Sequence, residues 1–188
     1  MKVLVATEKP FAAAAVNGIR EIVEGAGHEL ALLEKYTEKE QLLEAVADAD
    51  ALIVRSDKVT AEVVAAAKQL KIVVRAGAGY DNLDLPSCTE RGIVAMNTPG
   101  QNSNAVAELA LGLMIYMCRN QFTPGTGSEL SGKTMGIQGF GNIGQLVAKK
   151  AVGLGMNVLV LAPQPAEKHQ GWNTVAPACV EQKSWGLS

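Results

Sequence analysis

The sequence predicts an α/β fold in which parallel strands alternate with helices from the first residue onward. The strand segments, such as residues 3–6 and 51–54, are continuous apolar runs, as strands buried on both faces of a sheet require. The segments between them carry apolar residues at helical spacing. Because a β-α-β-α order of this kind favours a parallel sheet with helices on both faces, we expect that architecture here.

The expected elements follow in chain order. Strands are predicted at residues 3–6, 30–33, 51–54, 72–74, 93–96, 134–138 and 158–161, and helices at residues 10–24, 38–47, 61–68, 104–119 and from 142 to about 154. Gly25 and Gly27 end the first helix, and Thr60 is expected to cap the third. The glycine-rich loop 121–127 has the composition of a domain boundary. The pattern breaks at Ala162, so residues 162–188 are expected to be either a disordered tail or a terminus foreign to the fold.

Composition and charge exclude several classes of protein. Of the 188 residues, 48% are hydrophobic and 19% are charged, as in a globular protein. A net charge of −2 offers no basic surface for nucleic acid or an anionic membrane, and the apolar run 105–118 is too short to span a bilayer. Cys88, Cys118 and Cys179 lack metal-ligand spacing, so we expect no metal site and a reducing, cytoplasmic location.

A glycine motif says most about function. It lies between an expected strand and an expected helix and consists of Gly139, Phe140, Gly141, Asn142, Ile143 and Gly144. In that context the first glycine makes a tight turn, the second lets the backbone approach a pyrophosphate, and the third lets the helix pack close to the strand. The free N–H groups of the new helix would then bind the phosphates. The motif therefore predicts a dinucleotide-binding turn, and the residues that follow it suffice for only the first half of a Rossmann domain.

Three segments together carry a family resemblance. They are residues 75–82 (RAGAGYDN), 96–103 (MNTPGQNS) and 139–144 (GFGNIG). In this order and spacing they resemble the D-isomer-specific 2-hydroxyacid dehydrogenases, and most closely the short phosphoglycerate-oxidising members of that family. Residues 55–60 and 104–109 fit the same pattern, so the resemblance runs from residue 1 to about residue 161.

The resemblance implies a division of the chain and an activity. It implies a flavodoxin-like substrate-binding portion at residues 1–103, part of an NAD-binding Rossmann domain at residues 104–161, and the aberrant tail at 162–188. The implied reaction is hydride transfer between NAD and a small anionic D-2-hydroxy acid, with 3-phosphoglycerate at the first step of serine synthesis as the expected substrate. Reduction of hydroxypyruvate or glyoxylate, or oxidation of formate, is the alternative within the family. A homodimer through the nucleotide-binding region is also implied.

The resemblance also implies binding residues, each of which has a plainer interpretation. Those implied for the substrate are Arg55, Ser56, Arg75, Gly77 and Asn102, and those implied for the cofactor are Ala78 and the motif residues Gly139 to Gly144. Guanidinium groups bind carboxylates and phosphates bidentately, although either arginine could instead form a structural ion pair. Asn102 could serve only as a helix N-cap. Glu108, which interrupts an apolar helix, is expected to form a structural ion pair.

Catalytic residues are not expected in this sequence. The family's acid–base histidine, its glutamate partner and its substrate-orienting arginine lie downstream of the matching region. His28 and His169 do not match them and are expected to be ordinary surface residues. Ala162 stands where similar enzymes carry the aspartate that holds the adenosine ribose. The isolated chain is therefore expected to be inactive, and its alternative function is that of a non-catalytic fragment or nucleotide-binding module.

Overall fold

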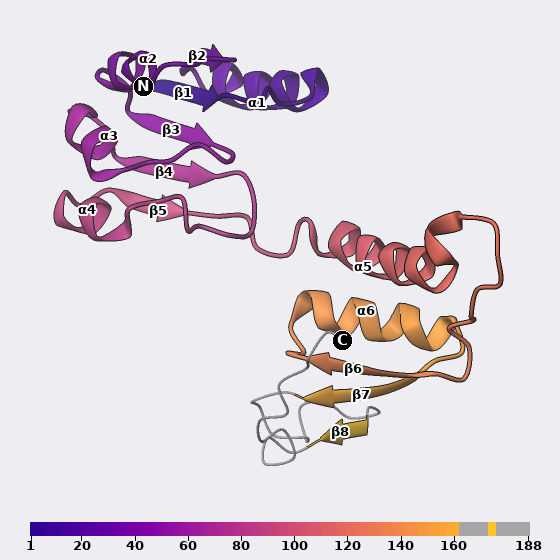
Figure 1. Cartoon of the computed structure of the whole chain (residues 1–188). Coiled ribbons are helices and arrows are strands. Elements are labelled where there is room, and N and C mark those ends of the chain that lie inside the picture. The colour runs from indigo at the N-terminus through magenta and orange to yellow at the C-terminus, as the bar shows by residue number, and fades with distance from the viewer. Residues whose placement is uncertain (162–172, 176–188) are drawn as a thin grey trace. The chain divides into compact units, whose positions relative to one another are not determined.

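The computed structural model describes residues 1–161 and 173–175, and it divides into two compact units, Met1–Gln101 and Asn102–Ser188 (Figure 1). The long helix α5 (Ser103–Cys118) belongs to the second unit, where it packs against α6 (Asn142–Gly153). Loop 121–127 therefore lies inside the second unit and is not the boundary that its composition predicts. Helix α5 belongs to the second unit because its apolar face packs against α6, whereas the glycine-rich loop only changes the direction of the chain.

The first unit contains a five-stranded parallel sheet with the order β2-β1-β3-β4-β5. Its strands are β1 (Lys2–Thr7), β2 (Glu29–Glu34), β3 (Ala51–Val54), β4 (Ile72–Arg75) and β5 (Val94–Met96). Its helices are α1 (Ala13–Gly25), α2 (Lys39–Val46), α3 (Ala61–Ala66) and α4 (Leu85–Glu90). This is the strand order of flavodoxin-like folds, in which ligands bind at the carboxyl edge of the sheet where the strand order reverses. The predicted α/β fold with a parallel sheet is confirmed.

Local signals explain where the helices of this unit begin. Helix α2 starts after a capping box in which the side chains of Glu38 and Gln41 bind each other's backbone N–H groups. Helix α4 was not expected, because its sequence LPSCTE is mostly polar and shows no apolar period. Its signals are Asp84, whose carboxylate accepts a hydrogen bond from Ser87 N at 3.0 Å, and a proline in the first turn. Thr60 precedes α3 without the expected capping hydrogen bond, and its buried Oγ1 has no partner in the described part of the chain.

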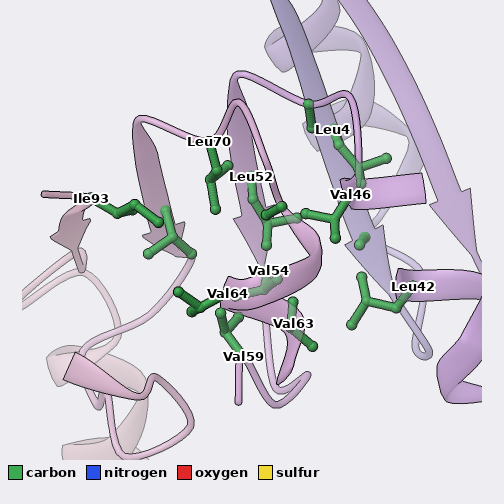
Figure 2. Close-up of a cluster of buried hydrophobic side chains, with 14 of the residues drawn as sticks. Leu4, Leu42, Val46, Leu52, Val54, Val59, Val63, Val64, Leu70 and Ile93 are labelled. Atoms are coloured by element: carbon green, nitrogen blue, oxygen red, sulfur yellow. The ribbon is translucent and has the colours of Figure 1, made fainter. Parts of the chain in front are cut away.

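The core of the first unit lies on one face of the sheet (Figure 2). Leu4, Leu52 and Val73 are in register on β1, β3 and β4, and helices α2 and α3 cover them with Leu42, Val46, Val63 and Val64. The second face is buried at Val5 but leaves Val94 and Met96 about half exposed on the edge strand β5. The expectation that the strands are buried on both faces therefore holds for β1 and fails for β5.

The second unit carries a three-stranded parallel sheet with the order β6-β7-β8. Its strands are β6 (Thr134–Gln138), β7 (Asn157–Leu161) and β8 (Asn173–Val175), and a 3₁₀ turn, η1 (Asn120–Phe122), follows α5. The core contains Ala107 and Leu111 of α5, Val147 and Ala151 of α6, and the sheet residues Ile137 and Val160. Strand β8 pairs with β7 in the register Leu159↔Asn173, which corrects the expectation of no strand beyond residue 161. The rest of the predicted tail lies outside the described residues.

The turn after α5 has an unusual backbone. Asn120, Gln121 and Phe122 have positive φ angles of 52°, 57° and 60°, in the left-handed region that side chains with a Cβ disfavour. The turn reverses the chain toward β6, and the ring of Phe122 packs edge-on against that of Tyr116 with centroids 5.3 Å apart. No helix among the described residues is long and apolar enough to cross a bilayer.

Candidate functional site

The carboxyl edge of the first sheet brings together the loops that follow β3, β4 and β5. Ala76 N donates to Val54 O at 2.8 Å, which ties the loop after β4 to the end of β3. On the other side, Thr98 N donates to Gly77 O at 2.9 Å and Asn97 Nδ2 donates to Ala78 O at 2.7 Å. These hydrogen bonds place four of the expected binding residues at one edge, namely Arg55, Arg75, Gly77 and Ala78.

The side chain of Arg75 is held in one position within this edge. Its Nε donates to the carbonyl oxygen of Arg55 at 2.9 Å. Its guanidinium group covers Gly77 so closely that a Cβ atom at position 77 would overlap Nη1 and Cζ. Neither Arg55 nor Arg75 forms an ion pair with any described residue. The alternative interpretation, in which these arginines form structural ion pairs, is therefore not supported within the described part of the chain. Two cations at this sheet edge are therefore without an acidic partner there and could bind an anion.

The N–H group of Gly77 is engaged within its own loop. It donates to the carbonyl oxygen of Arg75 at 2.9 Å. In this conformation an anion at the edge would meet the arginine side chains and the backbone beyond Gly77, starting with Ala78. The absence of a side chain at Gly77 leaves room for the Arg75 guanidinium.

A buried carboxylate fixes the loop that carries Arg55 and Ser56. Asp57 is 4% exposed, and its Oδ1 accepts hydrogen bonds from Glu8 N and from the Tyr36 hydroxyl, both at 2.8 Å. Its Oδ2 accepts a longer one from Arg55 N at 3.4 Å. Burial, and the hydrogen bond from the Tyr36 hydroxyl to Asp57 Oδ1, raise the pKa of Tyr36. Asp57 therefore joins the loops after β1 and β3, at the point where the strand order reverses.

Sequence reasoning missed Asp57 and Tyr36. The signal was available, since Asp57 is an acidic residue two positions after a buried strand, between Ser56 and Lys58. A buried carboxylate must be hydrogen-bonded, but the donors come from two other segments of the chain, and only the fold shows that they meet.

The second unit forms the strand–turn–helix arrangement that the glycine motif predicts. Strand β6 ends at Gln138, Gly139 adopts a φ of 91°, and Gly141 is the N-cap of α6. A Cβ at position 144 would overlap the carbonyl oxygen of Gly139, so only glycine lets the helix start this close to the strand. A Cβ at position 141 would meet no atom within 4 Å.

These observations fit a dinucleotide phosphate group. The open space above Gly141 lies beside the start of α6, where free N–H groups and the helix dipole favour an anion. Ile143 is partly exposed, whereas the Phe140 side chain is 7% exposed and belongs to the core. A ligand at this turn would therefore meet the backbone of Phe140 and not its ring.

Other residues singled out in the sequence lie elsewhere. Asn102 occupies the N-cap position of α5, but its side chain makes no capping hydrogen bond, so the expected capping role is wrong. Glu108 forms the expected ion pair, with Lys150 Nζ at 3.3 Å, and the hydrogen bond from Asn104 and the Lys150 charge lower its pKa. His28 precedes β2 and so lies at the amino edge of the first sheet, opposite Arg55 and Arg75. His169 and Ala162 lie outside the described residues.

No metal centre is found in the described ranges 1–161 and 173–175, where no group of three or more His, Cys, Asp or Glu residues could hold an ion. Both thiols in these ranges, those of Cys88 and Cys118, are free. The candidate site is therefore an arginine pair at one sheet edge in the first unit and a phosphate-binding turn in the second.

Comparisons with known proteins show which family the chain resembles. The profile of the family described as "D-isomer specific 2-hydroxyacid dehydrogenase, catalytic domain" matches residues 5–176. The chain is 42% identical over 154 residues to hydroxypyruvate reductase of Thermotoga maritima, covering 74% of this chain and 50% of that protein. It is 45% identical over 139 residues to D-3-phosphoglycerate dehydrogenase of Methanocaldococcus jannaschii, covering 66% of this chain and 26% of that protein.

Solved structures show the same likeness. The NAD⁺-bound 3-phosphoglycerate dehydrogenase of Entamoeba histolytica is 52% identical, with a TM-score of 0.86 over 93% of this chain and 57% of that one. The formate dehydrogenase of Staphylococcus aureus, in complex with NAD, is 28% identical, with a TM-score of 0.77 over 93% of this chain and 60% of that one. The chain spans half or less of the length of the two curated relatives. The chain belongs to the family of D-isomer specific 2-hydroxyacid dehydrogenases.

Proposed function

We propose that this chain supplies the substrate-binding portion and the phosphate-binding turn of an NAD-dependent dehydrogenase that oxidises 3-phosphoglycerate, the first step of serine biosynthesis. The observation that carries the proposal is the fixed Arg75 guanidinium beside Arg55 at the carboxyl edge of the first sheet. A substrate with both a carboxylate and a phosphate can be bound by two such cations, because a guanidinium group binds either anion in a bidentate manner. The likeness to 3-phosphoglycerate dehydrogenases supports this choice of substrate.

The residues of this chain would orient the two reactants. Arg55 and Arg75 would bind the anionic groups of the substrate, and the Ser56 hydroxyl would add a neutral hydrogen bond from the same loop. Backbone N–H groups at the start of α6 would bind the pyrophosphate of NAD, with Gly141 leaving room for its approach. Bound NAD would supply the hydride acceptor.

We further propose that the chain by itself binds these ligands without turnover. Oxidation of an alcohol needs a base within hydrogen-bond reach of the hydroxyl proton. His28 lies at the opposite edge of the sheet from Arg55 and Arg75, which supports this view. A nucleotide-binding module without catalysis is thus the proposed behaviour of the chain alone. The free thiols of Cys88 and Cys118 support a reducing, cytoplasmic location.

Reduction of hydroxypyruvate or glyoxylate is the second candidate. The match to hydroxypyruvate reductase over 154 residues specifically favours it. Hydroxypyruvate carries a carboxylate but no phosphate, so this activity would need one cation at the edge and not two. The phosphate is therefore the group that discriminates between the two candidates.

We also propose that two copies of the chain associate through α5. Leu109, Leu113 and Met117 recur every four residues along one side of this helix and are 63%, 54% and 63% exposed, while Ala107 and Leu111 are buried against the core. Exposed apolar stripes of this kind are typical of interfaces, and two identical stripes can pair about a two-fold axis. A homodimer would bury them.

Ligand titration of this chain tests the proposed substrate. Amide NMR spectra should show saturable shifts around residues 55–56 and 75–78 with 3-phospho-D-glycerate, and binding should be about tenfold weaker for D-glycerate, which lacks the phosphate. Arg75→Gln should abolish the difference, whereas Arg20→Gln on α1 should not. Equal affinity for the two acids would instead favour the second candidate.

A further inference from the structure

The second unit has a cavity that the proposed function does not use. It has a volume of about 270 Å³ and lies between the end of α5, the loop before β6 and the end of α6. Residues that line it include Ile115, Cys118, Arg119, Glu129, Leu130 and Leu154. The cavity adjoins the amino end of β6, whereas the Gly139–Gly144 turn follows its carboxyl end. The two sites are thus separated by the length of a five-residue strand, about 15 Å.

The walls of the cavity are tied together by backbone hydrogen bonds. Ser128 N donates to Cys118 O at 2.7 Å, which joins the loop to the end of α5. Gly132 N donates to Gly155 O at 2.9 Å, which joins the same loop to the segment after α6. The cavity is therefore preformed, and a ligand would not have to order its walls.

Two opposite charges border this space. Arg119 and Glu129 both contribute to the lining, and in the described part of the chain neither forms a salt bridge, with the other or with any third residue. The carbonyl ends of α5 and α6 both adjoin the cavity and add partial negative charge on the side where the helices end. The site thus offers one cation for an anionic group and a negative region for a cationic group.

The rest of the lining is mostly apolar. Ile115, Leu130 and Leu154 provide its aliphatic surface, and Cys118, Ser128 and Ser131 complete it. The volume is below the roughly 300–1,000 Å³ typical of pockets for drug-sized ligands, so the ligand must be smaller than those.

We propose that this cavity binds a free α-amino acid with an aliphatic side chain. Its carboxylate would pair with Arg119, its ammonium group would lie against Glu129 and the helix carbonyl ends, and its side chain would pack on Ile115, Leu130 and Leu154. A dicarboxylate or a simple fatty acid would leave Glu129 facing a like charge or an apolar group. The site is separate from both ligands of the proposed function and does not depend on it.

Titration of the chain with L-leucine, followed by amide NMR, tests the proposal. Saturable shifts should centre on residues 115–119, 128–131 and 154. Isocaproate, which lacks the ammonium group, and isoamylamine, which lacks the carboxylate, should each bind at least about tenfold more weakly. No saturable shift at tens of millimolar L-leucine would overturn the proposal. Equal binding of either analogue would do so too, because it would show that only one charge is recognised.

Two variants test whether Arg119 binds the carboxylate of the ligand and Glu129 its ammonium group. Arg119→Gln should weaken L-leucine binding about tenfold and leave the binding of isoamylamine, which has no carboxylate, unchanged. Glu129→Gln should also weaken L-leucine binding about tenfold, and it should leave the binding of isocaproate, which has no ammonium group, unchanged. Lys133→Gln, which changes a nearby charge outside the lining, should have no effect. If either variant loses the dispersed amide spectrum of a folded protein, the binding of isocaproate and isoamylamine to the unaltered chain still tests the proposal. Loss of L-leucine binding in Lys133→Gln alone would contradict the assignment.

Discussion

The Nε of Arg75 donates a hydrogen bond of 2.9 Å to the carbonyl oxygen of Arg55, the residue that follows the neighbouring strand. One arginine therefore fixes the backbone that carries the other, and the guanidinium group reaches this position only by lying across Gly77.

Gly77→Ala should displace the Arg75 side chain without unfolding the protein. The new Cβ would overlap Nη1 and Cζ of Arg75, which belong to the mobile end of a long side chain and can move away at small cost. We expect binding of 3-phospho-D-glycerate to weaken about tenfold and the free energy of unfolding to fall by about 0.5–1.5 kcal/mol, because the hydrogen bond from Arg75 Nε to Arg55 O is lost. Calorimetric titration and urea unfolding measure the two quantities. Unchanged binding would mean that the Arg75 position is not important for the ligand.

Gly141→Ala and Gly144→Ala should separate ligand binding from folding at the nucleotide turn. At position 144 the methyl group overlaps the Gly139 carbonyl oxygen, so we expect a loss of about 1–3 kcal/mol in the free energy of unfolding. At position 141 the methyl group meets nothing, so stability should be kept while NADH binding weakens, because the methyl occupies the approach of the pyrophosphate. Urea unfolding and NADH titration of both variants test this pair. A stable Gly144→Ala variant that binds NADH would refute it.

Tyr36→Phe should remove an alkaline loss of stability. Burial and the hydrogen bond to Asp57 raise the pKa of Tyr36 above its ordinary value of about 10. Above about pH 10 the unfolded chain has lost this proton and the folded chain keeps it, so the free energy of unfolding falls as pH rises. Tyr36→Phe should cost about 1.5–3 kcal/mol at neutral pH, the contribution of a hydrogen bond to a charged group, and should flatten the fall at high pH. Unfolding by urea at a series of pH values measures both effects, with Tyr80→Phe, an exposed tyrosine, as control.

Gln121→Gly should stabilise the second unit. Gln121 is held at a φ of 57°, a conformation that costs a residue with a Cβ about 1–2 kcal/mol and glycine almost nothing. Glycine is more flexible than glutamine in the unfolded chain, which offsets part of this gain. The free energy of unfolding should therefore rise by about 0.5–1 kcal/mol. Gln69→Gly, at an exposed position without a positive φ, should instead lower the stability. Thermal unfolding of the two variants gives the comparison, and a destabilised Gln121→Gly would show that the turn is not strained.

Leu113→Gln should weaken self-association of the chain. The side chain is 54% exposed at the middle of the apolar stripe of α5, so its replacement removes buried area from a dimer without disturbing the core. Sedimentation velocity over a range of concentrations should show dimers of the original chain and monomers of the variant. A chain that stays monomeric at high concentration would contradict the proposed interface.

The sequence predicts the two sheets well because the signals for their strands are local. Continuous apolar runs such as residues 51–54 and 72–74 become β3 and β4 within one residue. The glycine motif fixes the β6–α6 turn for the same reason, since its constraints lie within six residues. Helix α4 (LPSCTE) and strand β8 (NTV) were missed because, unlike α3 and β5, their sequences are mostly polar and carry no apolar run or period.

The candidate site is only partly predictable for a related reason. Arg55 and Arg75 can be chosen from the sequence because each follows an apolar strand and belongs to a recognisable motif. That Gly77 makes room for a guanidinium group, that Asp57 is buried under the loop, and that Asn102 does not cap its helix all depend on the positions of atoms far apart in the chain. Contacts of that kind leave no pattern in a single sequence.

The carboxylate of Asp57 divides the positions at this sheet edge into two groups for protein engineering. If Arg55 and Ser56 bind the substrate as proposed, changing either side chain should alter which acid is recognised and leave the loop where it is. Changing Asp57 releases the loops after β1 and β3 from each other, and changing Tyr36 removes the hydrogen bond that joins the Asp57 loop to the segment after β2, so residues on these loops should be repositioned together. A library aimed at new substrates should therefore randomise the first group and keep the second constant.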